Sequence, residues 1–419
     1  MQESTSIKSF KLLCGLYIIS LDFQFVLPYS FQIPEIVFVL LFGNFLLIKY
    51  PFKKIRLQSI DWAIIILLLS ILISALAKNE KSCYLDFAKI FYLFLVYLVF
   101  RSLRLFSAQN ILVEISKYFT LCGVFASIIA IMGVVLHFGG IQNTLTDVYY
   151  DFPYTGTLVR ALGYTTSPSM LMSLLCLCIL LQVIYFIPSA KNYIFLSLML
   201  LAAFLTFSKG FLLLLFGIFI FLLFKKSFTK TKKIIFGFSF VLMTTIYLLA
   251  THFIVKNTML YARTIFSGES AVYTGSKKTI YPSTYFTLKK VALNIGAENL
   301  LVGCGPGKFK SELKKLQAQN NYPANLPIYE PHSTPFGSFA ETGLVGICGL
   351  AAFVLLTLKD LKKYLISFDS KTKIFLISIS SIILIESFST DLLHFRMYWI
   401  VLAIFASLCT KNLSKEKTF

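Results

Sequence analysis

Charged side chains are scarce in this sequence. They make up 14% of its 419 residues, with 19 acidic residues against 39 lysines and arginines. Soluble globular domains carry about 25% charged residues, whereas this chain is 57% hydrophobic. The composition therefore excludes a soluble globular protein and indicates an integral membrane protein with several spans.

Several chemical signatures are also missing. The sequence has no P-loop, no glycine fingerprint for a dinucleotide and no zinc motif, so ATP-driven and metal-hydrolytic chemistry have no support. None of the eight cysteines shows metal-ligand spacing. Cys83 and Cys304 are expected on the far side of the membrane, where two free thiols are favoured over a disulfide. We expect no metal site and no cofactor.

Long apolar runs, by contrast, are abundant. A spanning helix needs roughly 20 mostly apolar residues, and such runs recur along the whole chain. The first run lacks a small-residue cleavage site, which favours a retained helix over a signal peptide. We expect a single all-α polytopic domain over residues 1–419, with about 12 spans by the length criterion. They are centred near residues 20, 40, 68, 94, 125, 176, 199, 217, 244, 346, 382 and 402.

The basic residues are grouped rather than scattered. In a soluble protein a net charge of +20 would suggest nucleic acid, but here the groups follow a membrane pattern. With a cytoplasmic N-terminus, counting spans places every group on the cytoplasmic side, as the positive-inside rule requires. The groups lie within residues 53–56, 101–104, 225–233, 359–373 and 411–417. We expect membrane lipids as partners, and no nucleic acid.

Two segments expected on the outer side differ in length. Residues 139–167 form a medium loop and residues 255–332 a long one, and long loops are uncommon unless they have a function. Within the long loop, YFTLKKVALNIGAENLL has the periodicity of an amphipathic helix along the surface. It is followed by tight glycine turns in LVGCGPGKF and a second helix in SELKKLQAQN.

Three basic residues fall outside the positive-inside pattern. Arg160 precedes a span in the medium loop, and Lys209 interrupts an apolar run at a Ser-Lys-Gly turn. Arg396 lies at the outer end of the last span, beside His394 and Asp391. As structural residues, Lys209 would snorkel and Arg396 would pair with Asp391. As functional residues, the three would converge on a phosphate or pyrophosphate group.

His332 is one of only four histidines and precedes the turn Ser333-Thr334-Pro335, which can start a helix. Glu341 lies about two and a half turns along that helix. An imidazole at the boundary between water and membrane can act as a general base near neutral pH. A loop-capping role for His332 is equally compatible with the spacing.

Four segments in this order resemble the bacterial O-antigen ligase and O-antigen polymerase superfamily. They are RALGYTTSPSML, LTFSKG, NIGAENLLVGCGPGKF and PHSTPFGSFAETGLVG, and the resemblance covers residues 155–350 by motif. It implies a GT-C-like fold with a long periplasmic loop in the bacterial inner membrane. It also implies transfer of a glycan from undecaprenyl pyrophosphate to an acceptor hydroxyl on the periplasmic face, without a metal.

Site residues are carried over by position. Arg160 matches the basic residue before the family's small-residue turn, and His332 matches the histidine at its helix start. Lys209 stands where the family usually has an arginine, which keeps the charge but loses the bidentate fork. The family's arginine at the start of the loop helix has no direct match. The candidates to replace it are Arg263, Lys289 and Lys290.

From these placements we expect Arg160 and Lys209, with Arg396 as a third cation, to bind the pyrophosphate, while His332 orients or deprotonates the acceptor hydroxyl. Ser333 and Glu341 are further substrate-binding candidates. The acceptor is the lipid A core in an O-antigen ligase and another lipid-linked repeat unit in a polymerase, and the sequence does not separate the two. A transporter of lipid-linked glycans is disfavoured, because repeat symmetry and broken helices near the midplane are not evident.

Overall fold

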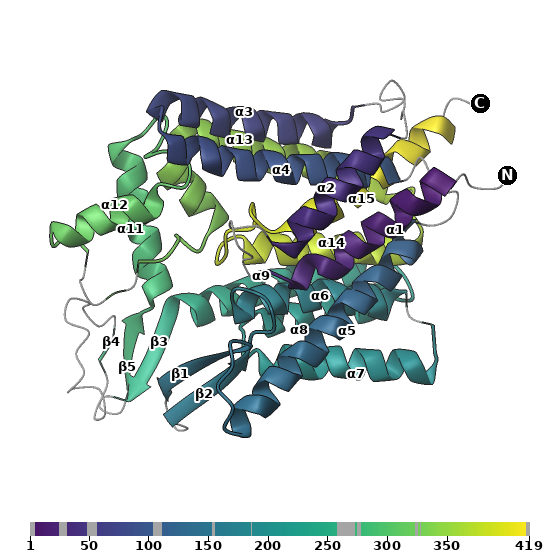
Figure 1. Cartoon of the computed structure of the whole chain (residues 1–419), viewed down its shortest axis with the longest axis horizontal. Coiled ribbons are helices and arrows are strands. Elements are labelled where there is room, and N and C mark those ends of the chain that lie inside the picture. Colours follow the sequence, from purple (N-terminus) through teal and green to yellow (C-terminus); the bar gives the residue numbers. More distant parts are fainter. Residues whose placement is uncertain are drawn as a thin grey trace.

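The fold is seen in a computed structural model, which describes residues 5–24, 32–47, 57–103, 111–152, 156–185, 187–257, 273–274, 278–322, 326 and 328–415. It is a bundle of helices with two small sheets (Figure 1). Among the described residues, five helices are long and apolar enough to cross a membrane. These are α3 (Ser59–Lys78), α4 (Lys81–Ser102), α5 (Ile111–Phe138), α9 (Lys230–His252) and α13 (Thr334–Leu365). The expectation of a helical membrane protein is confirmed.

Other helices are apolar but shorter. At a rise of 1.5 Å per residue, a helix of about 16 residues is shorter than the hydrocarbon layer of roughly 30 Å. The shorter apolar helices are α2 (Ile33–Leu47), α6 (Pro168–Ile184), α7 (Ala190–Leu205), α8 (Gly210–Phe224) and the Arg396–Cys409 part of α15 (Arg396–Lys415). With α1 (Thr5–Ile19) and α14 (Ser370–Glu386), they occupy the remaining apolar runs. The total of 12 spans stays a prediction.

Helices far apart in the sequence pack side by side. α3 lies along α13 and α4 along α15, while α5 packs against both α6 and α7 (Figure 1). Close approach depends on small residues at two contacts: a side chain on Gly123 would meet Met199 and Cys178, and one on Gly217 would meet Leu180. These helices share one continuous apolar core.

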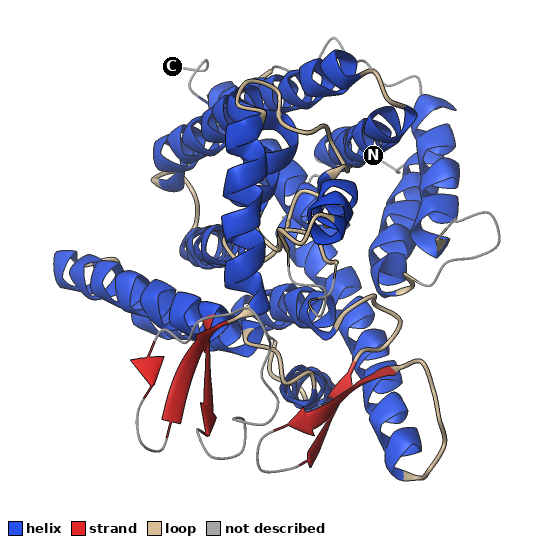
Figure 2. Ribbon diagram, turned by 90° about the vertical axis from the view of Figure 1, so that its left-hand side faces the viewer, coloured by secondary structure: helices blue, strands red, loops and turns tan. Residues whose placement is uncertain are grey.

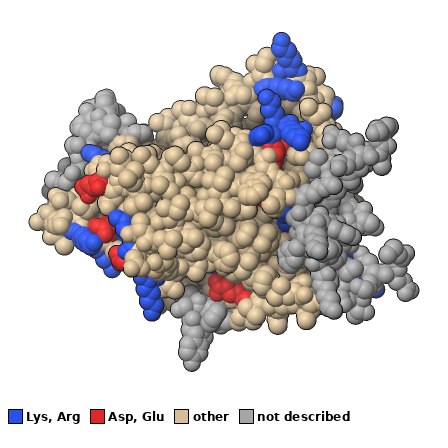
Figure 3. All heavy atoms as spheres, turned by 90° about the horizontal axis from the view of Figure 1, so that it is seen from above, with Lys and Arg blue, Asp and Glu red and all other residues tan. Residues whose placement is uncertain are grey.

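The two ends of the bundle differ. α1 begins and α15 finishes at one end, whereas both sheets and the helices α11 (Thr284–Glu298) and α12 (Phe309–Ala318) lie at the other, the loop-bearing end (Figure 1). On the face shown in Figure 3, most charged side chains of described residues lie toward the two ends, and most of the surface between them is uncharged. This distribution fits an apolar middle within lipid and two wetted ends. Residues 53–56, 104 and 417 of the basic groups lie outside the described residues.

The two sheets lie in or beside the two segments expected on the outer side, at the same edge of the bundle (Figure 2). β1 (Thr146–Phe152) and β2 (Gly156–Ala161) form an antiparallel hairpin between α5 and α6. In the long segment, β5 (Lys278–Pro282) pairs with both β3 (Phe253–Asn257) and β4 (Tyr273–Thr274). β3 follows α9 directly and β5 runs directly into α11, so their pairing closes the base of the long loop.

The glycine turns of LVGCGPGKF join a break in α13. Gly343 interrupts that helix with φ 62° and ψ −153°, a backbone conformation open essentially to glycine alone. The freed amides of Leu344 and Val345 donate to the carbonyls of Leu300 and Leu301, 2.8 and 3.1 Å away. A side chain on Gly303 would overlap the α13 backbone at Glu341. The turns of LVGCGPGKF and the break at Gly343 therefore form one structural unit, which we call the glycine-turn unit and which attaches the long loop to the bundle.

Candidate active site

Arg160 is positioned by the β1–β2 hairpin. The strand register places it opposite Asp147, whose carboxylate lies 3.8 Å from its guanidinium. Its Nε donates to the carbonyl oxygen of Thr206 over 2.9 Å, and its guanidinium lies 5.1 Å from the ring centre of Tyr149. The side chain is 15% exposed. Arg160 thus links the medium loop to the turn between α7 and α8.

That turn carries Lys209, as the sequence predicted. α7 ends at Leu205, Phe207 adopts a positive φ of 43°, and α8 begins at Gly210. The Lys209 ammonium lies 5.9 Å from the ring centre of Tyr285, on α11. Although the residue as a whole is exposed, burial of its ammonium and the charge of Arg160 lower the pKa of Lys209. Two cations from separate loops therefore lie close enough for one to affect the charge of the other.

Lys289 is the third cation at this place. Only 4% of this residue is exposed, whereas its neighbour Lys290 faces outward. Its ammonium forms a hydrogen bond with the ring nitrogen Nε2 of His252. Burial, with Lys209 as the second cause, lowers the pKa of Lys289 to about 8. Arg263, the remaining candidate for the loop cation, lies outside the described residues.

His332 lies beside these cations, between two aromatic rings. Its ring centre is 4.8 Å from that of Tyr285 and 5.8 Å from that of Tyr329, both in edge-to-face contact. Its backbone adopts φ 48°, an uncommon conformation for a residue other than glycine and one in which histidine is enriched. Burial, followed by the charge of Lys289, lowers the pKa of His332 to about 4. The imidazole is therefore neutral at physiological pH.

The turn after His332 starts α13, as predicted. Ser333 is the N-cap residue and Pro335 lies in the first turn. Ser333 is fully buried and its hydroxyl donates to the carbonyl of Ser387, 3.3 Å away, while the Thr334 amide donates to the same oxygen over 2.8 Å. These bonds attach the start of α13 to the end of α14. The Ser333 hydroxyl is thus used in a structural hydrogen bond, and the backbone directly after His332 is fixed against the end of α14.

Arg160, Lys209 and Lys289 form what we call the cation cluster. They come from the medium loop, the α7–α8 turn and α11, and each lies close enough to the next to influence its charge or that of His332. Like charges that lie close together in a partly desolvated site repel one another. Binding of an anion with several oxygens would relieve that repulsion through charge-assisted hydrogen bonds. The geometry fits a phosphate or pyrophosphate site with a neutral imidazole at its edge.

Arg396 lies elsewhere. Its guanidinium donates to the Glu35 carboxylate over 2.7 Å and lies against Tyr17 and Tyr92. Asp391, its expected partner, instead accepts a hydrogen bond from His394 over 2.8 Å. The expected pair of Arg396 and Asp391 is therefore wrong, because the chain turns between α14 and α15 so that Arg396 faces α2. The structure joins Arg160 with Lys209 but places Arg396 with other helices.

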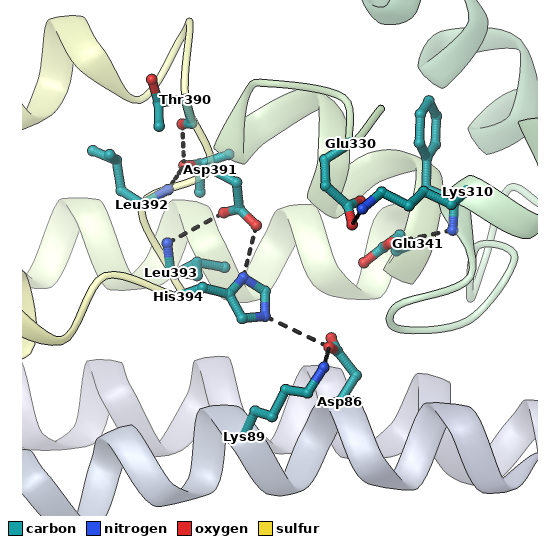
Figure 4. A network of polar contacts seen from close by, with 12 residues as sticks. Asp86, Lys89, Lys310, Glu330, Glu341, Thr390, Asp391, Leu392, Leu393 and His394 are labelled. Atoms are coloured by element: carbon teal, nitrogen blue, oxygen red, sulfur yellow. Dashed lines mark hydrogen bonds and ion pairs between the residues drawn. The ribbon is translucent and has the colours of Figure 1, made fainter. Parts of the chain in front are cut away.

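Glu341 has a structural contact within the glycine-turn unit rather than in the cation cluster. Its carboxylate accepts from the backbone amide of Phe309, 3.2 Å away, at the start of α12. Figure 4 shows it near a separate network at the loop-bearing end, in which His394 bridges Asp391 and, at 3.6 Å, Asp86. Although burial opposes its charge, Asp391 and Asp86 raise the pKa of His394 well above its ordinary value. This network carries a charged histidine, in contrast to neutral His332.

Two residues of the site were not found from the sequence. Tyr285 contacts both Lys209 and His332, and His252 contacts Lys289. A signal for Tyr285 was present, because it precedes Lys289 by four residues and shares its helix face. His252 and Lys289 are 37 residues apart in the sequence, and the pairing of β3 with β5 and the hydrogen bonds of Ser283 to the end of α9 bring them together.

Residues 194–351 match the family model described as O-Antigen ligase. The matched segment contains Lys209, His252, Lys289 and His332, together with the glycine-turn unit, and Arg160 lies before it. No curated protein matches the chain.

Proposed function

We propose that this chain, a member of the O-antigen ligase-related superfamily, is a membrane glycosyltransferase that transfers a glycan from undecaprenyl pyrophosphate to an acceptor hydroxyl. Members of this family are glycosyltransferase-like enzymes. The observation that carries the proposal is the meeting of three cations and a neutral histidine at one end of an apolar helix bundle. A lipid carrier lies in the bilayer and presents its pyrophosphate at the membrane surface. We propose that the cation cluster, at the loop-bearing end of the bundle, lies at that surface.

The cation cluster has the chemistry to bind the pyrophosphate. Arg160 is held by the Thr206 carbonyl and Lys289 by His252, so both charges are oriented before the substrate arrives. Donors that are fixed in advance stabilise charge developing on a leaving group without reorganising during the reaction. Lys209, on the turn between them, supplies the third charge. We assign Arg396 a role in packing, because Glu35 neutralises it.

His332 is proposed to take the acceptor proton. The acceptor oxygen forms a bond to the anomeric carbon as the bond from that carbon to the pyrophosphate oxygen breaks. The electron pair leaves with undecaprenyl pyrophosphate, and the proton passes to the imidazole. An imidazole whose pKa is about 4 is neutral but weakly basic. Because an opposite charge nearby raises the pKa of a histidine, the bound pyrophosphate itself makes His332 a stronger base.

The rings of Tyr285 and Tyr329 border His332 and limit how an acceptor sugar approaches it. Tyr285 lies on α11 and Tyr329 in the last part of the long loop, so we propose that this loop covers the site and helps to select the acceptor. The proposed arrangement is a GT-C-like bundle of about 12 spans. Its loop-bearing end would face the periplasm of the bacterial inner membrane.

A reconstituted reaction tests this function. Proteoliposomes with the purified protein receive an undecaprenyl-pyrophosphate-linked glycan together with either lipid A core or no further acceptor. We expect transfer of the glycan to lipid A core, which identifies an O-antigen ligase. Elongation of the lipid-linked glycan without added core would identify a polymerase, the alternative within the same family. Absence of any new glycosidic bond with either acceptor would contradict the proposed function.

A further inference from the structure

Lysine is a flexible point charge, so a lysine that binds an anion at a fixed place needs something to hold it. In the cation cluster, Arg160 is held by a backbone carbonyl, and Lys209 lies on a short turn. Lys289 reaches the cluster from the second turn of α11, and its ammonium meets the imidazole of His252 at the end of α9. The imidazole of His252 is therefore placed to hold the Lys289 ammonium by a hydrogen bond.

The hydrogen bonds of His252 define its protonation. Its Nδ1 lies 2.7 Å from the carbonyl oxygen of Leu248, which can only accept, and 3.0 Å from the Thr251 hydroxyl, which donates to that same carbonyl. Nδ1 therefore carries the hydrogen. Nε2 then has a free lone pair and accepts from the Lys289 ammonium. The chain of donors runs from Lys289 to His252 to Leu248. It leaves two of the three ammonium hydrogens available for other oxygens.

A neutral acceptor has an electrostatic advantage here. A carboxylate would also hold an ammonium, but it would cancel the charge that attracts the anion, as Glu35 does for Arg396. An imidazole that accepts through Nε2 orients Lys289 and leaves its full positive charge in the cluster. The other charged group that bears on this pair is also cationic, because Lys209 acts on both Lys289 and His252.

The backbone around His252 is held as firmly as its side chain. The Ser283 amide donates to the His252 carbonyl and the Ser283 hydroxyl to the Thr251 carbonyl, each over 2.7 Å. Directly beyond, Phe253 pairs with Pro282 at the start of the β3–β5 ladder. The end of α9 and the start of α11 are thus joined independently of the imidazole. Substituting the His252 side chain leaves this junction in place, so its effect on Lys289 can be measured separately.

We propose that His252 is a positioning residue that holds the Lys289 ammonium in the cation cluster for binding of the pyrophosphate group. This rests on the proposed function for the identity of the natural ligand. His252 touches neither the glycan nor the reacting atoms and acts through Lys289.

A double-mutant cycle tests the proposal, with binding of inorganic pyrophosphate to the full-length protein in detergent measured by calorimetry. His252→Leu is expected to weaken binding on the order of tenfold, the effect of one hydrogen bond to a charged group. His252→Gln, which keeps a neutral acceptor, should restore most of the affinity. In a Lys289→Met background, His252→Leu should have no further effect. His137→Leu, at the end of α5, is the matched histidine control and should bind as the unchanged protein does.

Equal weakening by His252→Leu with and without Lys289 would overturn the proposal, as would a Gln variant as weak as the Leu variant. If His252→Leu does not fold, His252→Gln is compared with His252→Glu. The Glu variant keeps an acceptor but cancels the charge, so it should bind pyrophosphate more weakly, and equal binding would contradict the proposal. Pyrophosphate binding with the expected cycle but no glycan transfer would refute the proposed function alone.

Discussion

At the scale of single residues, the site depends on groups whose charge states differ from their ordinary ones. His332 is kept neutral by burial and nearby lysines, and Lys289 is a cation whose pKa is about 8. In the proposed function, substrate binding needs Lys289 protonated, and proton transfer needs His332 unprotonated. Both conditions hold together only between the two pKa values. The site is therefore matched to neutral pH by two groups that are each shifted downward.

This predicts the pH profile of kcat/KM for glycan transfer, which reports groups of the free enzyme. Activity should fall below about pH 4 as His332 gains a proton, and above about pH 8 as Lys289 loses its charge. Lys289→Arg keeps the positive charge at all accessible pH values. In this variant the fall of kcat/KM at alkaline pH should disappear, while the fall at acid pH remains. An unchanged alkaline limb in this variant would show that another group titrates there.

At the scale of elements, the junction between the glycine turns and α13 places His332 relative to the long loop. The sequence predicted helices close to α11 and α12, the turn at Lys209, and the start of α13 after His332. Those features follow from local periodicity, capping residues and proline. The break at Gly343 was not predicted, because it depends on backbone groups of Leu300 and Leu301 some 40 residues earlier. For a related reason the sequence did not show which of Lys289 and Lys290 faces the site. The packing of α11 on α13 decides which face of α11 is buried.

The junction predicts a strong effect of Gly343→Ala on stability. The new Cβ would lie 2.6 Å from backbone atoms of Leu301 and Gly303, in a conformation that L residues rarely adopt. We expect a loss of about 1–3 kcal/mol or more from backbone strain, measured as a lower thermal unfolding midpoint in detergent. Gly237→Ala on α9 is the matched control, because a Cβ there meets nothing within 4 Å. A midpoint that falls equally in both variants would contradict this role of Gly343.

At the scale of the whole molecule, a largely uncharged surface separates two charged ends on the face shown in Figure 3, and the candidate site lies at the loop-bearing end. Composition alone predicted a helical membrane protein, because few charges and many apolar runs leave no other class. The convergence of Arg160, Lys209 and Lys289 was predicted only in part. Arg396 was expected among them, but its position depends on the turn before α15, which apolar periodicity does not describe.

Topology is testable with single cysteines in a variant that lacks the native ones. Lys314→Cys on α12 is exposed at the loop-bearing end, and Lys230→Cys is exposed at the start of α9, at the other end. In intact spheroplasts, a membrane-impermeant maleimide should label position 314 at once and position 230 only after lysis. Labelling of position 230 alone in intact spheroplasts would place the site on the cytoplasmic side and contradict the proposed orientation.

The most direct test of the central claim measures the rate of glycan transfer in proteoliposomes for the unchanged protein, His332→Ala and His137→Ala. Loss of a general base typically lowers a rate by about 10²–10⁴-fold. We therefore predict that His332→Ala reduces transfer by at least 100-fold, with pyrophosphate binding and protein yield retained, and that His137→Ala transfers normally. Transfer by His332→Ala at the rate of the unchanged protein would contradict the account of this site.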